Sequence, residues 1–218
     1  TLIKFLENIV YYALMIVVLL TALGKLGVET TSFLAILGAA GLAIGLALKD
    51  SLGNFASGVM IIMFKPFKVG DAVTAAGVTG NVSEVGIFNS VFITADNQKI
   101  IVPNGAITSG SITNINAYDT RRVDLVVCIG YEDDIKKTKE VLNNIVSSHE
   151  KILIDKGITI AVSELADSSV NFVLRVWVKT PDYWDVKFDL TETIKLRFDA
   201  EGISIPFPQQ DVHHYNKI

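Results

Sequence analysis

The sequence contains a single cysteine, Cys128, in 218 residues, so no disulfide can form within the chain. This scarcity excludes the disulfide-rich secreted modules. Cys128 stands in an apolar run, residues 126–129, where we expect a buried structural thiol. Charged residues are also scarce, at 19% against 50% hydrophobic residues, which excludes an intrinsically disordered chain. The composition is too apolar for an ordinary soluble domain.

Motifs of catalysis and cofactor binding are missing as well. The sequence has no P-loop, no glycine-rich nucleotide fingerprint after a strand, no HExxH and no CxxC. The adjacent His213 and His214 would point to opposite faces of a strand, so we expect them at the surface rather than on a metal. We therefore expect no enzymatic activity, no cofactor and no metal site. A metal- or nucleotide-sensing enzyme on a membrane anchor remains a hypothesis beside the two non-enzymatic ones given below. Ligand-dependent stabilisation of the soluble part would support it.

The few charges are distributed unevenly along the chain. Residues 1–70 contain five lysines and three acidic residues, a local net charge of +2, whereas the rest of the chain carries −6. The charged fraction rises from about 11% in the first part to about 23% in the second, which is close to that of soluble domains. The sequence therefore predicts a membrane region followed by an acidic, water-exposed region. A basic nucleic-acid binder is excluded, and we expect no nucleic acid as a partner.

Two uncharged runs predict a transmembrane hairpin. They cover residues 8–24 and 30–48, and their lengths are close to the roughly 20 apolar residues that span a bilayer. Lys4 lies at one end of the hairpin, and Lys65 and Lys68 flank its exit on the same side. The positive-inside rule then places both chain ends in the cytoplasm. We expect a multi-pass protein of the cytoplasmic (inner) membrane with a cytoplasmic C-terminal domain.

The second run alternates small with aliphatic residues, and a helical projection sorts the small residues into two flanks. Leu42 and Leu46 point between these flanks. Small residues allow helices to approach closely, so the glycine flank of one copy can pack on the alanine flank of the next, and such head-to-tail contacts close into a ring. Leu42 and Leu46 would then converge on the ring axis as a pore gate. A helix that merely packs in a bundle or dimerises is the alternative. The packing residues are Gly38, Gly41 and Gly45 on one flank and Ala35, Ala39 and Ala43 on the other.

Two charged residues end this run. Lys49 shares the face of the two leucines, so we expect it at the inner pore mouth, where the neighbouring Asp50 can offset its charge. The next 14 residues, 51–64, are uncharged but too few to span a bilayer comfortably. They predict an interfacial or protein-covered helix that turns away from the membrane axis. The expected hinge region comprises Asp50, Gly53 and Gly58, with Asp50 or Ser51 as a possible helix cap.

Several segments together resemble the MscS-like small-conductance mechanosensitive channels. They are residues 37–48 (LGAAGLAIGLAL), Ser51 to Asn54, Gly58, residues 64–71 (FKPFKVGD), residues 102–105 (VPNG) and residues 206–211 (PFPQQD). The resemblance covers essentially the whole chain. It implies a homoheptamer whose pore is lined by the second segment, with leucine rings at Leu42 and Leu46 as the closed constriction. It also implies a preceding membrane helix that is absent here, so we treat the sequence as a fragment.

The resemblance has two further implications for the second segment. The family usually has glycine where this chain has Asp50, at the bend of the pore helix. We also expect a group of residues around the end of the next helix to couple the pore helix to the following domain. These coupling residues are Asn54, Lys65, Pro66, Phe67 and Lys68.

The predicted fold class is a membrane α-helical hairpin plus an α+β cytoplasmic region. Residues 1–64 form the transmembrane hairpin with the pore-lining and interfacial helices. Residues 65–117 have the short, turn-punctuated strands of a small β domain, for which the resemblance implies an Sm-like fold. Residues 118–205 read β-α-β-β-α-β, typical of a ferredoxin-like sandwich. Residues 206–218 can add a last strand, which by resemblance belongs to an oligomeric β-barrel.

The functional hypothesis is a channel opened by membrane tension. A narrow ring of leucines offers water no hydrogen bonds, so it stays dewetted and closed at rest. The open pore would release ions and small solutes with weak selectivity during hypoosmotic shock. The expected partners are further copies of the chain, as a heptamer by resemblance, together with membrane lipids and the permeating ions and solutes. The alternative is a non-channel, membrane-anchored oligomeric scaffold, which substitution of Leu46 by serine would distinguish.

Overall fold

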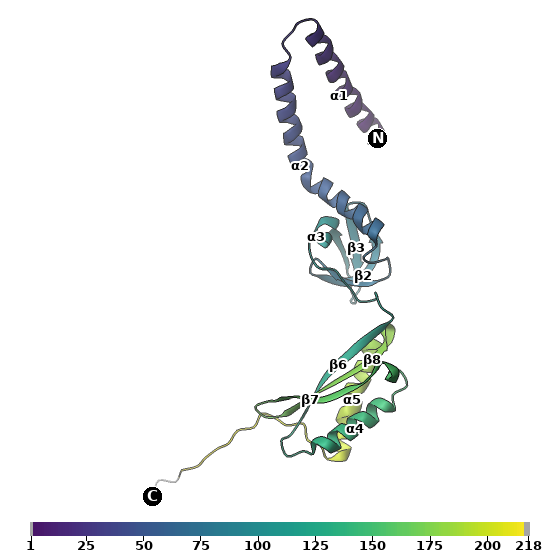
Figure 1. Cartoon of the computed structure of the whole chain (residues 1–218), viewed down its shortest axis with the longest axis vertical. Coiled ribbons are helices and arrows are strands. Elements are labelled where there is room, and N and C mark those ends of the chain that lie inside the picture. The colour runs from purple at the N-terminus through teal and green to yellow at the C-terminus, as the bar shows by residue number, and fades with distance from the viewer. Residues whose placement is uncertain (1, 216–218) are drawn as a thin grey trace. The chain divides into compact units, whose positions relative to one another are not determined.

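The computed structural model describes residues 2–215 of the chain. It divides into two compact units, the first made of Thr1–Val69 and Ala75–Ile112 and the second of Gly70–Thr74 and Thr113–Ile218. The first unit holds the apolar helices and most of the β domain, and the second holds the α/β domain. Figure 1 shows the order of these elements along the chain.

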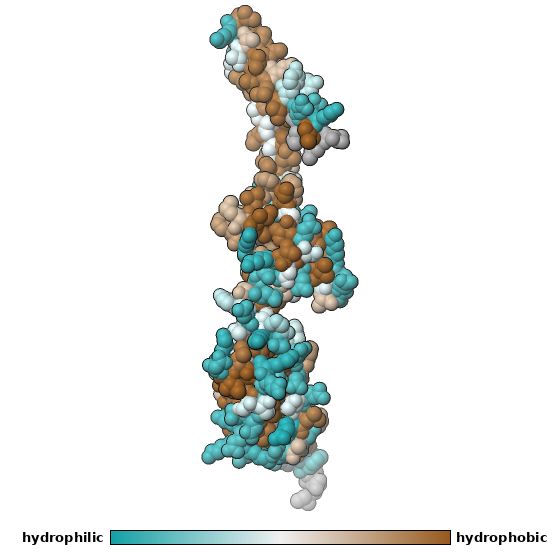
Figure 2. Space-filling view, turned by 90° about the vertical axis from the view of Figure 1, so that its right-hand side faces the viewer, coloured by the Kyte–Doolittle hydropathy of each residue, from teal (hydrophilic) through white to brown (hydrophobic). Residues whose placement is uncertain are grey.

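Two long apolar helices form the N-terminal hairpin. Helix α1 (Leu2–Lys25) and helix α2 (Thr31–Phe64) are joined by a short turn in which Gly27 has a positive φ of 84°. Both helices are long and apolar enough to cross a membrane, and their apolar windows are not buried within the chain. Figure 2 shows hydrophobic side chains covering this part, whereas hydrophilic ones are interspersed over the remainder. The predicted hairpin is thus present, with its apolar surface outward.

Helix α2 runs without interruption through residues 49–51, which corrects one of the two expectations for this region, a helix cap at Asp50 or Ser51. Lys49 and Asp50 are both helical, so neither Asp50 nor Ser51 caps a new helix. The ribbon bends part-way along its length while the helix continues (Figure 1). Lysine is a good helix former and aspartate is tolerated, so the two charges change the surface of the helix without ending it. The helix ends at Lys65, whose left-handed backbone (φ 48°) lets its N–H donate to the Ile61 carbonyl at 2.9 Å.

The β domain is a five-stranded sheet of order β4-β3-β2-β1-β5. Its antiparallel pairings include β2 with β3 and β3 with β4, and the register shifts between Val82 and Glu84. Phe92 and Val82 are buried in its core. The strands confirm the predicted short-strand pattern, while the helix after Pro103 was not predicted. The elements are β1 (Ala72–Ala75), β2 (Val78–Val85), β3 (Asn89–Ile93), β4 (Lys99–Pro103), α3 (Asn104–Thr108) and β5 (Thr113–Asn114).

The α/β domain is built on a three-stranded antiparallel sheet of order β6-β8-β7. Helices α4 and α5 bury their apolar stripes in one shared core with the sheet, around Leu142, Phe172 and Phe198. Asp134 caps α4 by accepting hydrogen bonds from the N–H groups of Lys136 and Lys137. The elements are β6 (Thr120–Ile129), α4 (Ile135–Ser147), η1 (Ile154–Lys156), β7 (Thr159–Leu165), β8 (Val170–Lys179), η2 (Thr180–Asp182) and α5 (Tyr183–Glu201).

Two expectations for this domain need correction. Cys128 on β6 is half-buried rather than fully buried, because inward and outward side chains alternate along the strand. The sixth element of the ferredoxin-like pattern is missing, since residues 203–215 contain no strand. A strand needs a partner edge to satisfy its backbone hydrogen bonds. The prediction of a barrel strand therefore concerns several copies of the chain, and its last residues, 216–218, lie outside the described part.

Candidate pore helix and its seam with the β domain

The two predicted gate leucines are strongly exposed on α2. Leu42 and Leu46 lie one helical turn apart, and 66% and 64% of their surfaces are accessible in the single chain. Burying a leucine stabilises a protein by about 1.5–3 kcal/mol, so an exposed pair on a helix implies a covering environment outside the chain. Lipid, another copy of the chain, or a dry pore axis would provide such an environment.

The glycine flank of α2 serves no packing within the chain. Gly38, Gly41 and Gly45 have no atom within 4 Å of the position that a Cβ would take, counting the described residues outside the helix backbone. Glycine inside a helix costs about 1 kcal/mol relative to alanine. Three such residues without an intrachain contact indicate that their small size serves a contact outside this chain. The alanine flank is likewise exposed, with Ala35, Ala39 and Ala43 all on the surface.

The second half of α2 packs tightly on the β domain at Gly58. A Cβ on this residue would lie 2.1 Å from the Ile87 carbonyl oxygen and 2.5 Å from the Asn104 amide nitrogen. Only glycine permits this approach, because both atoms are fixed by their own hydrogen bonds or backbone. Gly53, the other predicted hinge residue, has open space instead. The structure thus gives Gly58 a packing role that sequence analysis did not assign to it.

Hydrogen bonds join α2 to α3 on either side of Gly58. The side-chain Oδ1 of Asn54 accepts from the Gly105 backbone N–H at 2.8 Å, and the Thr108 hydroxyl donates to the Ser57 hydroxyl, also at 2.8 Å. We call this contact, formed by Asn54, Ser57 and Gly58 with Asn104, Gly105 and Thr108, the α2–α3 seam. The face of α2 opposite the seam stays exposed and apolar. That face carries Leu52, Phe55, Val59, Ile62 and Met63.

Asn104 organises the β-domain side of the seam and was missed as a functional residue. Its amide nitrogen donates to the carbonyls of Gly86 (2.9 Å) and Ile87 (3.1 Å), and its side-chain oxygen accepts from the buried Ser90 hydroxyl at 2.8 Å. Asn104 itself is fully buried. A buried amide with all these partners fixes one arrangement of the loop. The VPNG motif contained this residue, but it was used only for the family resemblance.

The predicted coupling residues divide into two groups. Phe67 is 2% exposed and packs on Phe92, with ring centroids 6.3 Å apart, so it fixes the chain to the β-domain core. Lys65 ends the helix, while Pro66 and Lys68 lie exposed beside it. Ile61, also 2% exposed, completes the apolar part of this attachment. Among the predicted coupling residues, Asn54 and Phe67 contact the β domain, and Ser57, Gly58 and Ile61 add to this attachment.

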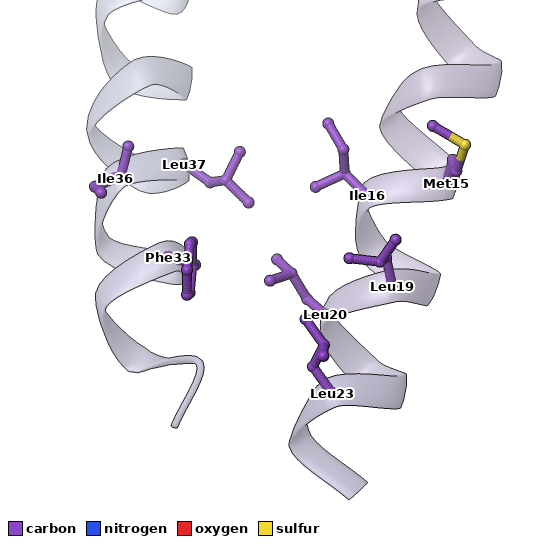
Figure 3. A pocket seen from close by; sticks show the side chains of 8 residues that line it. All are labelled: Met15, Ile16, Leu19, Leu20, Leu23, Phe33, Ile36 and Leu37. Carbon is purple, nitrogen blue, oxygen red and sulfur yellow. The ribbon is translucent and has the colours of Figure 1, made fainter. Parts of the chain in front are cut away.

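An apolar hollow of about 300 Å³ lies between α1 and α2 near the turn of the hairpin. Figure 3 shows its side chains pointing toward one another from the two helices, with no polar group among them. A space of this kind is filled by apolar groups such as acyl chains or side chains of another helix. The lining residues are Met15, Ile16, Leu19, Leu20, Leu23, Phe33, Ile36 and Leu37.

The α/β domain carries ion pairs on its surface. The Lys151 ammonium lies 2.9 Å from Asp182 and 3.2 Å from Asp185, and these hydrogen bonds raise the pKa of Lys151. A bidentate hydrogen bond from Arg122 lowers the pKa of Asp124 on the same strand. The Lys151 contacts reach η2 and α5, whereas the Arg122 contact lies within β6.

Comparison with known proteins decides the family. Three family descriptions match successive parts of the chain: "Mechanosensitive ion channel, transmembrane helices 2/3" over residues 8–49, "Mechanosensitive ion channel, beta-domain" over 50–117, and "Mechanosensitive ion channel MscS, C-terminal" over 123–205. A relative from Edwardsiella ictaluri, named small-conductance mechanosensitive channel, is 50% identical over 218 residues, covering 100% of this chain and 76% of the relative. The chain belongs to the MscS family of mechanosensitive channels.

Further members of the MscS family support the same conclusion. A small-conductance mechanosensitive channel from Helicobacter pylori is 34% identical, covering 96% of this chain and 77% of that protein. The crystal structure of Helicobacter pylori MscS in its closed state matches with a TM-score of 0.89 and 33% identity, over 98% of this chain and 85% of the other. Arabidopsis thaliana MSL1, at 21% identity and a TM-score of 0.76, shares the fold over 93% of this chain and 75% of that chain. The MscS family is a channel family and not an enzyme class, which favours the channel hypothesis over a scaffold.

Proposed function

We propose that this chain assembles into a homoheptameric, tension-gated pore in the cytoplasmic membrane, lined by the first half of α2. The observation that carries the proposal is the flank of open glycines beside the exposed Leu42 and Leu46. Close packing of the glycine flank on the alanine flank of the next copy explains why the glycines are there. The same packing turns both leucines toward a common axis. The number seven comes from family membership and not from the geometry of one chain.

The leucine rings act as a hydrophobic gate. Leucine side chains offer water no hydrogen bonds, so a narrow ring of them is dewetted and blocks ions without a physical plug. Membrane tension favours the conformation that occupies more area in the bilayer. The small residues on both flanks let neighbouring helices slide, which separates the leucines and wets the pore. With no carbonyl filter in α2, the open pore passes ions and small solutes with weak selectivity, as relief from hypoosmotic shock requires.

The α2–α3 seam transmits force between the membrane and the β domain. Helix α2 continues from the gate leucines to Lys65, so a shift of the pore helix reaches the β domain through one hydrogen-bonded rod. The hydrogen bond from Gly105 to Asn54 and the contact at Gly58 tie that rod to α3. Lysines at positions 4, 65 and 68 favour a cytoplasmic location for both ends of the hairpin and for the domains that follow. Lipids contact the apolar outer surface of α1.

Patch-clamp recording of the protein in liposomes under graded suction tests this proposal. The recording compares the unmodified protein with Leu46→Ser and a matched control, Ile44→Ser, which alters an exposed aliphatic residue on the outward side of the projection. We expect stepwise currents that rise with suction and a lower threshold in Leu46→Ser, because a hydroxyl wets the gate. Ile44→Ser should leave the threshold near that of the unmodified protein.

The scaffold alternative predicts a different outcome. A scaffold with tightly packed α2 helices would give no current at any suction, and Leu46→Ser would only lower its thermal stability. Silence of a correctly inserted and assembled oligomer would therefore overturn the proposal. Equal thresholds for both serine variants would refute the assignment of the pore face while leaving the channel itself intact.

A further inference from the structure

Lys49 and Asp50 are the only charged residues of α2, in a helix of 34 residues. Both are exposed, and neither takes part in an ion pair with another residue of the described chain, 2–215. Neighbouring residues on a helix point about 100° apart and do not face each other, so the expected offset of the Lys49 charge by Asp50 is not an ion pair within one chain. Ionisable residues in membrane-spanning helices are rare, and they commonly pair with one another.

The helical projection places the two charges on different flanks. Taking Gly38 as the origin, Lys49 falls at about 20°, beside the glycine flank. Asp50 falls at about 120°, between Ala39 at about 100° and Ala43 at about 140°. The charges thus continue the glycine flank and the alanine flank toward the end of the pore-lining half. When the glycine flank of one copy packs on the alanine flank of the next, Lys49 of the first copy lies on the side that faces Asp50 of the second.

We infer that Lys49 of each copy forms an ion pair with Asp50 of the next copy, so that a closed circle of these pairs fastens the end of the pore-helix ring. The inference rests on the proposed pore. It adds an ion pair between neighbouring copies that depends on two residues of this particular sequence. The circle is complete only when the last copy meets the first, because every copy donates through Lys49 on one side and accepts through Asp50 on the other. It leaves the pore mouth without net charge from these residues.

The circle also biases gating. Sliding of adjacent α2 helices moves Lys49 of one copy relative to Asp50 of the next, so the pairs break or stretch as the leucines separate. Fixed opposite charges at contact distance favour the closed ring. Asp50 therefore supplies a specific contact at a position where the family usually has glycine.

Cross-linking tests the contact without requiring conduction. The background is Cys128→Ala, which removes the only native thiol. In this background the double variant Lys49→Cys with Asp50→Cys is compared with each single variant, using a thiol-specific cross-linker whose reach matches a lysine–aspartate pair. Contacts between position 49 and position 50 of the next copy propagate around a ring, so the double variant should give a ladder up to the full oligomer. Each single variant can link copies only in pairs.

Charge exchange tests the effect on gating. Lys49→Gln and Asp50→Asn should each lower the tension threshold in liposome recordings, whereas the exchanged double variant, Lys49→Asp with Asp50→Lys, should restore it toward the unmodified value. Lys139→Gln on α4, an exposed lysine remote in sequence from the pore helix, is the matched control and should change nothing.

The outcomes separate this inference from the proposed function. A double-cysteine variant that stops at dimers, or an exchanged variant no better than the two single changes, overturns the ion-pair circle even if tension-gated currents are normal. A full ladder with no current in any variant keeps the circle and removes the channel. A ladder with restored gating in the exchanged variant supports both.

Discussion

At the scale of single residues, identical amino acids on one helix have opposite roles. Gly53 and Gly58 are five positions apart on α2, and sequence analysis treated them alike as candidate hinge points. In the structure Gly58 is buried against the Ile87 carbonyl and Asn104, whereas Gly53 faces open space. The difference arises from a contact with residues that lie far along the sequence, and helix periodicity cannot reveal it.

Alanine substitution of these two glycines should therefore have opposite effects. Gly58→Ala should lower the free energy of unfolding by about 1–3 kcal/mol, since the methyl group overlaps backbone atoms that cannot move away. Gly53→Ala, the matched control, should raise it by about 0.5–1 kcal/mol by reducing the freedom of the unfolded chain. Thermal unfolding of the purified protein in detergent measures both. Equal effects of the two substitutions would contradict the tight seam.

A second residue-scale prediction concerns pH. Hydrogen bonding from Arg122 holds the pKa of Asp124 below its ordinary value of 3.8, with the charge of Arg122 acting in the same direction. A lowered pKa in the folded state stabilises the fold above the unfolded pKa, and this contribution is lost as the pH falls through the folded pKa. Arg122→Gln should therefore move the acid-unfolding midpoint to higher pH.

Intrinsic tryptophan fluorescence follows this acid transition, because both tryptophans, Trp177 and Trp184, belong to the α/β domain. Trp177 lies opposite Arg122 in the strand register. Lys139→Gln serves as a control that removes an unpaired surface charge of the same sign. If Arg122→Gln and the control have the same midpoint, the pairing of Arg122 with Asp124 does not contribute to acid stability.

At the scale of elements, local patterns predicted most of the fold. The two uncharged runs, the short strands of the β domain and the βαββα order of the α/β domain follow from periodicity and turn residues, which act over a few positions. Helix α3 escaped prediction because five residues are too few for a periodic signal. Whether α2 would continue through Lys49 and Asp50 was left open between a bend and a new helix cap, because a pair of charges marks a change of environment without fixing the backbone.

The site was less predictable than the fold, for physical reasons. The small residues and Leu42 and Leu46 could be chosen from the projection of one helix, yet their contacts depend on other copies of the chain and stay predictions. Asn54 was predicted as a coupling residue, but its partner Gly105 was not, because the two are 51 positions apart. Asn104 and Ser90 form a buried polar pair that no local pattern marks.

At the scale of the whole molecule, the C-terminal tail has few contacts in a single chain. Its apolar residues Phe207, Val212 and Tyr215 are 82%, 69% and 91% exposed, whereas Ile203, just before it, is buried in the α/β core. One of its hydrogen bonds to the domain runs from the Gln209 N–H to the Ser168 hydroxyl at 3.1 Å. Such a segment gains stability chiefly by pairing with other copies, as the predicted barrel strand requires.

Truncation after Ile205 tests this role. Without residues 206–218, we expect the α/β domain to fold as before, with unchanged tryptophan emission, because its buried residues end at Ile203. The oligomer should become weaker, since the barrel contacts are lost. Native mass spectrometry in detergent should show a complex of seven 23.7 kDa chains for the intact protein and smaller species for the truncated one. A truncated protein that keeps the full mass would show that the barrel does not hold the ring together.

The separation of the seam partners along the sequence also determines an order of assembly during synthesis. Asn54 leaves the ribosome 51 residues before Gly105, an interval of roughly 3–10 s at about 5–20 residues per second. Throughout this interval the first half of α2 can enter the lipid, while the surface of Gly58 still lacks the loop that will cover it. The nascent protein therefore passes through a stage in which the second half of α2 is uncovered, because the β-domain loop that packs on Gly58 is made later.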